Sequence, residues 1–334
     1  MSRIAILGGG SWGTGLSVVL GHSRRKHDIR IWVREASIAQ AIRENLENPA
    51  YLAGVPIPAC VQASTDLGEV LHEAQIVLGV VPSAHARSVY SQAVAHLSPE
   101  AAIVSASKGL EPATHLRMSE VIAQVLSLKF IPRVAVLSGP SFALEAAKGE
   151  PTAVVLASKD RGLASFLQEE FASPNFRLYT NDDVLGVELA GAMKNVIAIA
   201  AGACQGLGLG ANSLAALITR GLAEMARLIV ALGGKPDTLS GLAGLGDLVL
   251  TCHGALSRNR SVGFELGRGR SLEEILQGMK MVAEGVGTTE ALLALAQEQH
   301  IELPITEQVH SILHLGNSPR DAIRAIMERP LKKE

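Results

Sequence analysis

Short apolar runs alternate with helical patterns along the first half of the chain. Several runs, among them IVLGVV at 76–81 and VAVL at 134–137, contain no alternating polar residues, which is typical of parallel strands covered on both faces. Strands are predicted at Arg3–Leu7, Ile29–Val33, Gln75–Val81, Ala102–Ala106, Val134–Ser138, Ala153–Ala157 and Phe176–Tyr179. Helices are predicted between them at Gly13–Ser23, Ser37–Leu46 and Leu116–Leu126. This alternation of strands and helices predicts a doubly wound α/β domain.

The pattern changes after Asn181, where strand-like runs cease and long Ala- and Leu-rich segments begin. Helices are predicted there at Val184–Ala203, Ser213–Leu232, Thr288–Gln299, Ile305–His314 and Pro319–Glu328. No Pro- or Ser-rich linker separates the two halves. The sequence therefore predicts two domains, an α/β domain over residues 1–184 and an all-helical domain over residues 185–334.

The longest uncharged stretch, Asn195–Thr219, is long enough to raise the question of a membrane span. Polar Gln205 interrupts it, and the glycines at 206, 208 and 210 would break a spanning helix. The N-terminal residues MSRIAILGGG contain too short an apolar run for a secretory signal. A soluble, cytoplasmic chain without membrane insertion is therefore predicted.

Composition and charge exclude several classes of protein and of binding partner. The chain has 334 residues, 48% hydrophobic and 19% charged, which excludes a disordered protein. Lys and Arg number 30 against 32 Asp and Glu, so a net charge of −2 gives no general attraction to nucleic acid or acidic membranes. The cysteines Cys60, Cys204 and Cys252 are scattered and odd in number, which fits a reducing cytosol without a disulfide framework.

A glycine-rich loop follows the first predicted strand. Residues 8–13, GGGSWG, match G-x-G-x-x-G between the strand and the first helix. Gly8 permits a tight turn, Gly10 lets the backbone approach a pyrophosphate, and Gly13 allows close packing of helix on strand. The free N–H groups at the helix start would bind the phosphates. The sequence predicts a Rossmann-like dinucleotide site here; a purely structural glycine turn is the alternative.

The end of the second predicted strand bears on the choice of dinucleotide. An acidic residue is expected there in NAD-binding proteins, whereas a cation accommodates the 2′-phosphate of NADP. Arg34 stands near this position and favours NADP, while Glu35 next to it keeps NAD possible. Both residues could also be ordinary surface charges.

Lys194 is the most informative polar residue. It lies in ELAGAMKNVIAIAAGA, a segment apolar on nearly all sides and so typical of a buried helix. Small neighbours such as Ala190 and Ala198 would leave room for a ligand beside the ammonium. Burial lowers the pKa of a lysine toward the range useful for acid/base catalysis. The alternative is a lysine that reaches the surface from a partly exposed helix.

Two candidate loops follow predicted strands of the α/β domain, where ligands bind to open parallel sheets. Lys108 follows AAIVSAS, and it could otherwise be a surface lysine. Gly139 and Ser141 belong to GPSFA, which opens the helical segment FALEAAK. Ser141 could instead cap that helix.

Two further segments of the second half concentrate glycine or basic residues. The glycines of GLAGLGD at 241–247 suggest a close approach to another group, and Asp247 could simply cap the next helix. SRNR at 257–260 places serine and arginine at a helix start, a favourable phosphate site, with a solvated basic turn as the alternative.

Other constellations predict no chemistry. His310 and His314 lack a third metal ligand nearby and are interpreted as surface or interface residues, so no metal site is predicted. Cys252 and His253 are adjacent and diverge on a helix, which argues against a catalytic pair. The basic segment SRRKHDIR at 23–30 is interpreted as a solvated helix end.

Taken together, the ordered motifs resemble the bacterial-type NAD(P)-dependent glycerol-3-phosphate dehydrogenases over nearly the whole chain. The matching segments are GGGSWGT (8–14), VVPS (80–83), SKGLE (107–111), SGPSFA (138–143), GAMKNVIAIAAG (191–202), ITRGLAEM (218–225), AGLGDLVLTC (243–252), SRNR (257–260) and VAEGVGT (282–288). The resemblance implies a Rossmann-like domain followed by an all-α domain like the C-terminal domain of 6-phosphogluconate dehydrogenase. It also implies hydride transfer between NADPH or NADH and dihydroxyacetone phosphate, which yields sn-glycerol 3-phosphate for phospholipid synthesis, and a homodimer.

The same resemblance assigns site residues. Lys194 is implied as the general acid/base. Substrate contacts are implied for Lys108, Gly139, Ser141, Lys194, Asn195, Asp247, Thr251, Ser257, Arg258 and Asn259. Cofactor contacts are implied for Gly8, Gly10, Ser11, Trp12, Gly13, Arg34, Lys108, Ala143, Arg258, Val282 and Glu284.

Two other functions remain compatible with these motifs. One is a two-domain β-hydroxyacid-type dehydrogenase, which would need a carboxylate site where the phosphate clamp is expected. The other is a non-catalytic NADPH sensor, which would have no use for the Lys194 and Lys108 pair.

Overall fold

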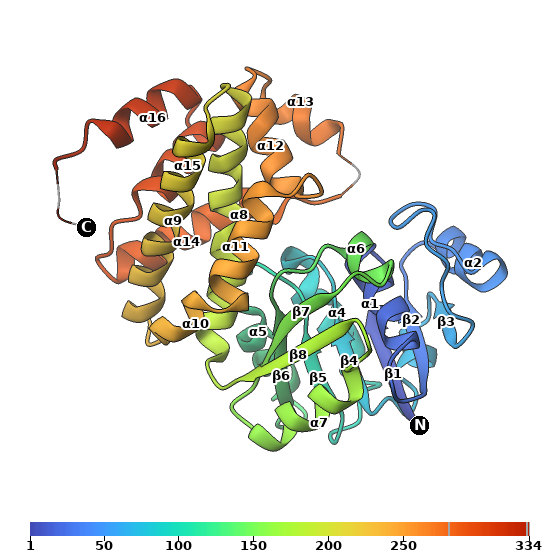
Figure 1. Ribbon diagram of the computed structural model, residues 1–334. Coiled ribbons are helices and arrows are strands. Elements are labelled where there is room, and N and C mark those ends of the chain that lie inside the picture. Colours follow the sequence, from blue (N-terminus) through green and yellow to red (C-terminus); the bar gives the residue numbers. More distant parts are fainter. Residues whose placement is uncertain (280, 332, 334) are drawn as a thin grey trace. The chain divides into compact units, whose positions relative to one another are not determined.

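The computed structural model describes residues 1–279, 281–331 and 333, and the chain divides into two compact units (Figure 1). The first unit comprises Met1–Lys108 and Leu116–Glu188, and the second comprises Gly109–His115 and Leu189–Glu334. The second unit thus includes a short segment from the middle of the first half of the chain.

An eight-stranded sheet in the order β3-β2-β1-β4-β5-β6-β7-β8 forms the centre of the first unit. Its strands are β1 (Ser2–Leu7), β2 (His27–Trp32), β3 (Val61–Ser64), β4 (Ile76–Gly79), β5 (Ala102–Ser105), β6 (Arg133–Ser138), β7 (Thr152–Ala157) and β8 (Phe176–Asn181). All neighbours are parallel except β6 and β7, which pair antiparallel. The strand order reverses between β1 and β4, which is where a doubly wound sheet binds its ligand.

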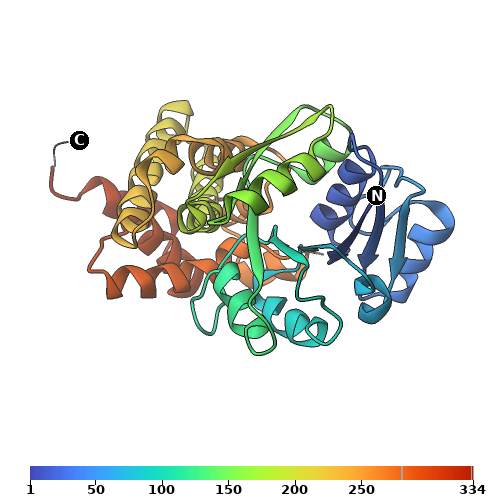
Figure 2. The same cartoon turned by 90° about the horizontal axis from the view of Figure 1, so that it is seen from below.

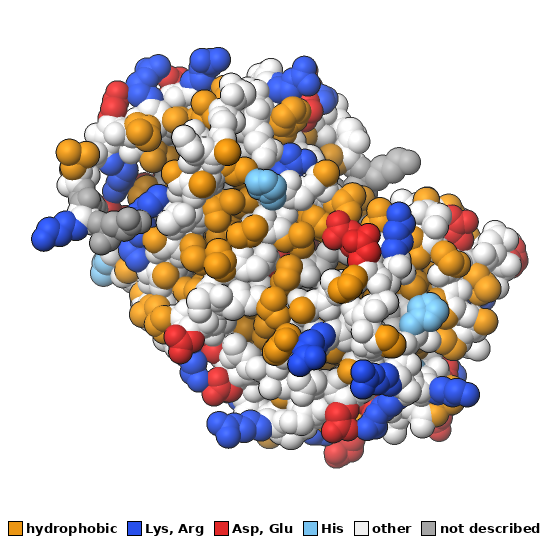
Figure 3. Space-filling model, in the orientation of Figure 1, with side chains coloured by type: hydrophobic (Ala, Val, Ile, Leu, Met, Phe, Trp, Pro, Cys, Tyr) orange, Lys and Arg blue, Asp and Glu red, His pale blue; other side chains and the backbone are white. Residues whose placement is uncertain are grey.

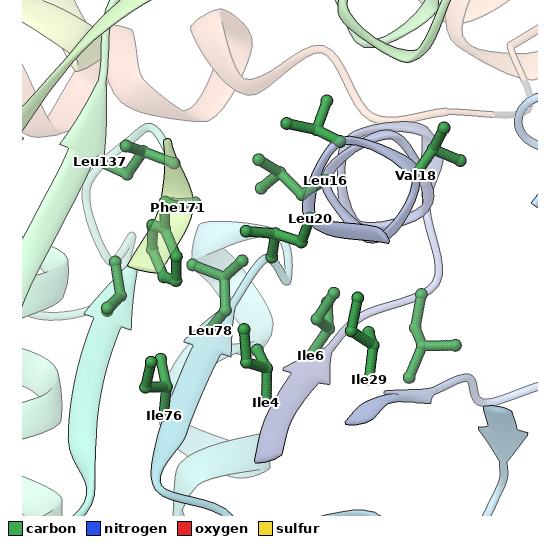
Figure 4. Packing of buried hydrophobic residues seen from close by; sticks show 14 of the residues in the cluster. Ile4, Ile6, Leu16, Val18, Leu20, Ile29, Ile76, Leu78, Leu137 and Phe171 are labelled. Carbon is green, nitrogen blue, oxygen red and sulfur yellow. The ribbon is translucent and has the colours of Figure 1, made fainter. Parts of the chain in front are cut away.

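Helices cover both faces of this sheet (Figure 2). They are α1 (Ser11–Gly21), α2 (Ala36–Asn45), α3 (Leu67–Leu71), α4 (Ser83–Ala93), α5 (Met118–Leu126), α6 (Ala143–Ala147) and α7 (Arg161–Phe171). Leu16 and Leu20 of α1 face strand residues such as Ile4 and Ile6, with Phe171 of α7 in the same cluster (Figure 4). Helices α3, α4 and α5 pack on the opposite face. Burial on both faces explains why the strands read as continuous apolar runs.

The second unit is helical. Helix α8 (Val184–Gly206) runs into it, followed by α9 (Ala211–Ala231), α10 (Pro236–Ser240), the π-helical turn η1 (Leu242–Gly246), α11 (Asp247–His253), α12 (Arg258–Gly267), α13 (Leu272–Gln277), α14 (Glu284–Glu298), α15 (Pro304–His314) and α16 (Pro319–Met327). By length and composition α8 could cross a membrane, yet 83% of its apolar window is buried inside the protein. The helix breaks at the glycines that follow, with Gly208 at a φ of +78°.

The predicted strands and helices are all present, with ends shifted by a few residues. The predicted α/β class of the first half and the helical class of the second are confirmed. Strand β3 was not predicted, because VQAS is short and half polar. The antiparallel pairing of β7 with β6 was not predicted, because a buried apolar run has the same composition in either strand direction.

The interpretation of residues 23–30 as a solvated helix end is wrong. Helix α1 ends at Gly21, and His27 begins the inner strand β2 with 3% of its surface exposed. Arg25 donates to the carboxylates of Glu169 (2.6 Å) and Glu170 (2.7 Å) at the end of α7. The basic residues therefore join α7 to the start of β2.

Charges of both signs are mixed at the surface. On the face shown in Figure 3, Lys and Arg side chains stand among Asp and Glu side chains. This mixing agrees with the net charge of −2 over the full sequence.

Candidate functional site

The glycine loop between β1 and α1 has the geometry of a dinucleotide cradle. Gly8 has a φ of +119°, which favours glycine. A Cβ at Gly13 would lie 1.8 Å from the carbonyl oxygen of Gly8, so only glycine allows this turn to close. A Cβ at Gly10 would meet no atom of the described residues within 4 Å, which leaves open space at the N-cap of α1. The first N–H groups of α1 receive no side-chain cap from Gly10, as a phosphate-binding helix start requires.

This geometry predicts different effects for alanine at Gly13 and at Gly10. Gly13→Ala is expected to lower the melting temperature and to abolish NADPH binding, since the new Cβ collides with backbone. Gly10→Ala is expected to keep the wild-type melting temperature while weakening NADPH binding, since its Cβ would occupy only the phosphate space. Thermal unfolding and NADPH fluorescence titration measure the two effects. Equal loss of stability in both variants would contradict the cradle.

Asn48 supports this loop through hydrogen bonds, although it was not among the residues predicted for the site. Its side chain is fully buried and donates to the carbonyl of Gly9 (2.9 Å) and to Thr14 Oγ1 (2.8 Å). It lies in NPAYLAG, an irregular segment without strand or helix pattern. The irregularity is the only sequence signal that could have pointed to it.

Ser11 and Trp12 belong to the same loop, and Arg34 follows the neighbouring strand β2. Ser11 donates to the carbonyl oxygen of Tyr51 (2.7 Å), and Trp12 packs against the core. The side chain of Arg34 is 76% exposed and donates to Glu35 (2.8 Å), whose hydrogen bond and charge raise the pKa of the guanidinium. A 2′-phosphate at Arg34 would have to compete with Glu35.

A hydrogen bond from Lys108 joins the loop after β5 to the loop after β6. Lys108 Nζ and Ser141 Oγ both donate to the carbonyl oxygen of Gly139, each at 2.9 Å. Ser141 does not cap α6, since Phe142 is its N-cap residue. Ala143 opens α6 and packs on α1, where a Cβ at Gly15 would come within 3.3 Å of Ala143 Cβ. The structure thus brings Lys108, Gly139 and Ser141 together at the carboxyl edge of the sheet.

Lys194 is buried in the second unit. Its side chain is 9% exposed and donates to Asp247 Oδ1 (3.0 Å) and to Thr251 Oγ1 (2.9 Å) on α11. The interpretation as a lysine that reaches the surface is therefore wrong. Asp247 does not cap α11 either, since Gly246 is the N-cap and the Asp247 side chain, 1% exposed, faces the ammonium. A buried pair of this kind costs about 3–5 kcal/mol to break by removing one partner.

The glycines before Asp247 serve this arrangement. A Cβ at Gly244 would lie 2.3 Å from the carbonyl oxygen of Leu239, so the close approach expected for this segment is to its own backbone in α10. The π-helical turn η1 then leads directly into α11. Such π-helical turns are rare in proteins, and those that occur are often found at functional sites.

Cys252 lies beside the ion pair but is not reactive. It is fully buried, and burial raises the pKa of its thiol to about 12. The thiol therefore stays protonated at neutral pH, whereas a catalytic cysteine acts as the thiolate.

Three helices of the second unit meet through buried amides. Asn259 on α12 donates to Asn195 Oδ1 on α8 (2.8 Å) and accepts from the backbone N–H of Gly285 on α14 (2.9 Å). Ser257 caps α12 by accepting from the N–H of Arg260 (3.2 Å). Arg258 is exposed, and desolvation by its surroundings lowers the pKa of its guanidinium while the charge of Glu284 raises it. Val282 is 51% exposed.

Metal ligands do not gather anywhere in the described residues, where no group of three His, Cys, Asp or Glu side chains could hold an ion. The rings of His310 and His314 lie with their centroids 5.0 Å apart and their planes tilted by 39°, and His314 Nδ1 lies 3.7 Å from Glu290 Oε1.

Comparison with known proteins places these features in one family. Models described as the N-terminus and the C-terminus of NAD-dependent glycerol-3-phosphate dehydrogenase match residues 3–164 and 183–324. The chain belongs to the NAD-dependent glycerol-3-phosphate dehydrogenase family. Glycerol-3-phosphate dehydrogenase [NAD(P)+] of Koribacter versatilis is 55% identical to it, over 100% of this chain and 99% of that protein.

Solved structures agree with this family. The crystal structure of glycerol-3-phosphate dehydrogenase from Coxiella burnetii is 42% identical, with a TM-score of 0.92 over 98% of this chain and 99% of that chain. A ketopantoate reductase from Ralstonia eutropha is 20% identical, with a TM-score of 0.58 over 96% of this chain and 99% of that chain. The second likeness shows the fold alone, which the dehydrogenase family therefore shares with enzymes of other names.

Proposed function

We propose that this protein catalyses the reversible reduction of dihydroxyacetone phosphate to sn-glycerol 3-phosphate with NADPH or NADH. The observation that carries the proposal is the buried Lys194, held by Asp247 and Thr251 in a chain of this family. When bound, the nicotinamide supplies or accepts the hydride. The glycine cradle at 8–13 fits the pyrophosphate of such a dinucleotide, since its geometry leaves open space at the start of α1.

Lys194 handles the proton that the reaction requires. In reduction its ammonium donates a proton to the C2 oxygen, and in oxidation its amine accepts the proton of the C2 hydroxyl. Asp247 and Thr251 accept hydrogen bonds from Nζ and hold it in one position. Burial on α8 keeps water from competing for this proton.

The remaining family residues bind and orient the substrate. Substrate contacts are proposed for Lys108, Gly139, Ser141, Asn195, Asp247, Thr251, Ser257, Arg258 and Asn259. Arg258 is the phosphate clamp, since a cation beside the first turn of α12 suits a dianion. Cofactor contacts are proposed for Gly8, Gly10, Ser11, Trp12, Gly13, Arg34, Lys108, Ala143, Arg258, Val282 and Glu284.

The proposal extends to the setting of the enzyme. Residues 1–184 form the dinucleotide domain and residues 185–334 the substrate domain of a cytoplasmic homodimer that supplies glycerol 3-phosphate for phospholipid synthesis. Exposed Arg34 supports NADP as cofactor, whereas its ion pair with Glu35 leaves NAD usable.

The test follows NADPH oxidation by the purified protein with dihydroxyacetone phosphate. Parallel assays use NADH and, in place of the phosphate ester, a set of 3-oxo acids. Turnover of dihydroxyacetone phosphate alone supports the proposal. Turnover of the oxo acids alone would indicate a hydroxyacid dehydrogenase, and NADPH binding without any turnover would indicate a sensor.

A further inference from the structure

Helices α8 and α12 cross with their backbones in direct contact. A Cβ at Gly202 would lie 1.9 Å from the carbonyl oxygen of Arg260, and one at Gly263 would lie 1.9 Å from that of Ile199. One turn farther along, a Cβ at Gly206 would lie 2.2 Å from the carbonyl oxygen of Phe264, and one at Gly267 would lie 2.5 Å from that of Ala203. Two glycines on each helix, four residues apart, therefore leave no side chain between the two backbones.

A hydrogen bond between side chains joins the same two helices at the other side of this crossing. Asn195 on α8 accepts from Asn259 on α12 at 2.8 Å, and both residues are buried, at 4% and 8% exposure. Asn259 also accepts from Gly285 N–H, next to Glu284, so the start of α14 is held to the same point. Asn195, Asn259 and Gly285, which these two hydrogen bonds link, each directly follow a residue of proposed function. Those residues are Lys194, Arg258 and Glu284.

The crossing therefore fixes two proposed functional groups at once. Lys194 precedes Gly202 by eight residues of continuous α-helix, about 12 Å along the axis, and Arg258 precedes Gly263 by five residues, about 7.5 Å. Side chains at an ordinary helix contact can change rotamer to absorb a shift. Backbone atoms in contact cannot, so the separation of the main-chain positions that carry Lys194 and Arg258 is set by this contact.

We propose that the glycine crossing of α8 and α12 is a specificity determinant that sets the carbonyl-to-phosphate length of the accepted substrate. Lys194 engages the carbonyl oxygen and Arg258 the phosphate of the same molecule, so their fixed separation selects the number of carbons between these groups. Gly202, Gly206, Gly263 and Gly267 act as positioning residues and touch no ligand. This inference rests on the function proposed above.

The experiment uses two ketones that cannot lose their phosphorus group. 4-Hydroxy-3-oxobutylphosphonate has the length of dihydroxyacetone phosphate, and 5-hydroxy-4-oxopentylphosphonate is one methylene longer. The wild type is expected to prefer the shorter compound in kcat/KM. Gly263→Ala is expected to reduce this preference at least about tenfold, by raising KM for the shorter compound while the longer one is affected less. The Kd for NADPH is expected to stay unchanged, because the glycine cradle at 8–13 is not altered.

Control variants separate spacing from general damage. Gly267→Ala meets its neighbour at 2.5 Å rather than 1.9 Å and should reduce the preference by a smaller factor. Gly210→Ala, with no atom of the described residues within 4 Å of its Cβ, should leave the preference unchanged. An equal fall of kcat/KM for both phosphonates, an unchanged preference, or loss of folding in both crossing variants would overturn the inference. A wild type that does not reduce dihydroxyacetone phosphate would instead overturn the proposed function.

Discussion

Replacing Lys194 by alanine is expected to lower kcat for dihydroxyacetone phosphate by about 10²–10⁴-fold, the usual contribution of a general acid. Binding of NADPH is expected to persist, since the glycine cradle belongs to the first unit and Lys194 to the second. Steady-state kinetics and a fluorescence titration of NADPH measure the two quantities. The variant Lys159→Ala, which removes an exposed lysine outside the proposed site, serves as the control.

The loss of activity must be distinguished from the loss of an ion pair. Lys194→Ala leaves the carboxylate of Asp247 buried without its ammonium partner, which costs about 3–5 kcal/mol of stability. The double variant Lys194→Met with Asp247→Asn removes both charges and is expected to recover part of the melting temperature but none of the turnover. Recovery of turnover together with stability would refute the acid/base role of Lys194.

Replacing Arg258 by alanine is expected to raise KM for dihydroxyacetone phosphate by about 10²-fold, because a charge-assisted contact to the phosphate is lost, a change of about 2–3 kcal/mol. Weak turnover of dihydroxyacetone, which lacks the phosphate, should change far less. The ratio of kcat/KM for the two ketones measures the clamp.

Arg268→Ala provides the matched control for this variant. It removes an arginine at the C-cap of the same helix, where the guanidinium lies 5.9 Å from the ring of Phe264. The net charge changes equally in both variants, so a general electrostatic effect would raise KM in both. Unchanged KM in Arg258→Ala would move the phosphate clamp to another residue.

The sequence contains strong signals for the fold and for part of the site. Buried parallel strands leave apolar runs, and a glycine turn between strand and helix has few other uses, so the sheet and the cradle could be predicted. Lys194 could be selected because a charge inside an apolar helix requires a partner. Its partner Asp247 stood in a glycine-rich segment, where capping explained it equally well.

What the sequence does not contain are contacts between distant segments. The hydrogen bond from Asn259 to Asn195 joins residues 64 positions apart. The family resemblance selects both residues, yet no pattern in the sequence pairs them with each other. The glycines of α8 and α12 show no unusual feature until the two helices are placed side by side. Asn48 likewise becomes informative only once the loop that it supports is known. The roles of such residues depend on tertiary contacts, which cannot be recognised from the sequence around each residue.

The chain path has a consequence for attempts to divide this protein. Because Gly109–His115 packs with the second unit while its flanking residues Lys108 and Leu116 pack with the first, the polypeptide passes between the units three times rather than once. A cut after Glu188 would deprive the C-terminal fragment of a piece of its own structure. The two halves are therefore poor candidates for separate expression, exchange with the halves of a relative, or release by a single protease nick.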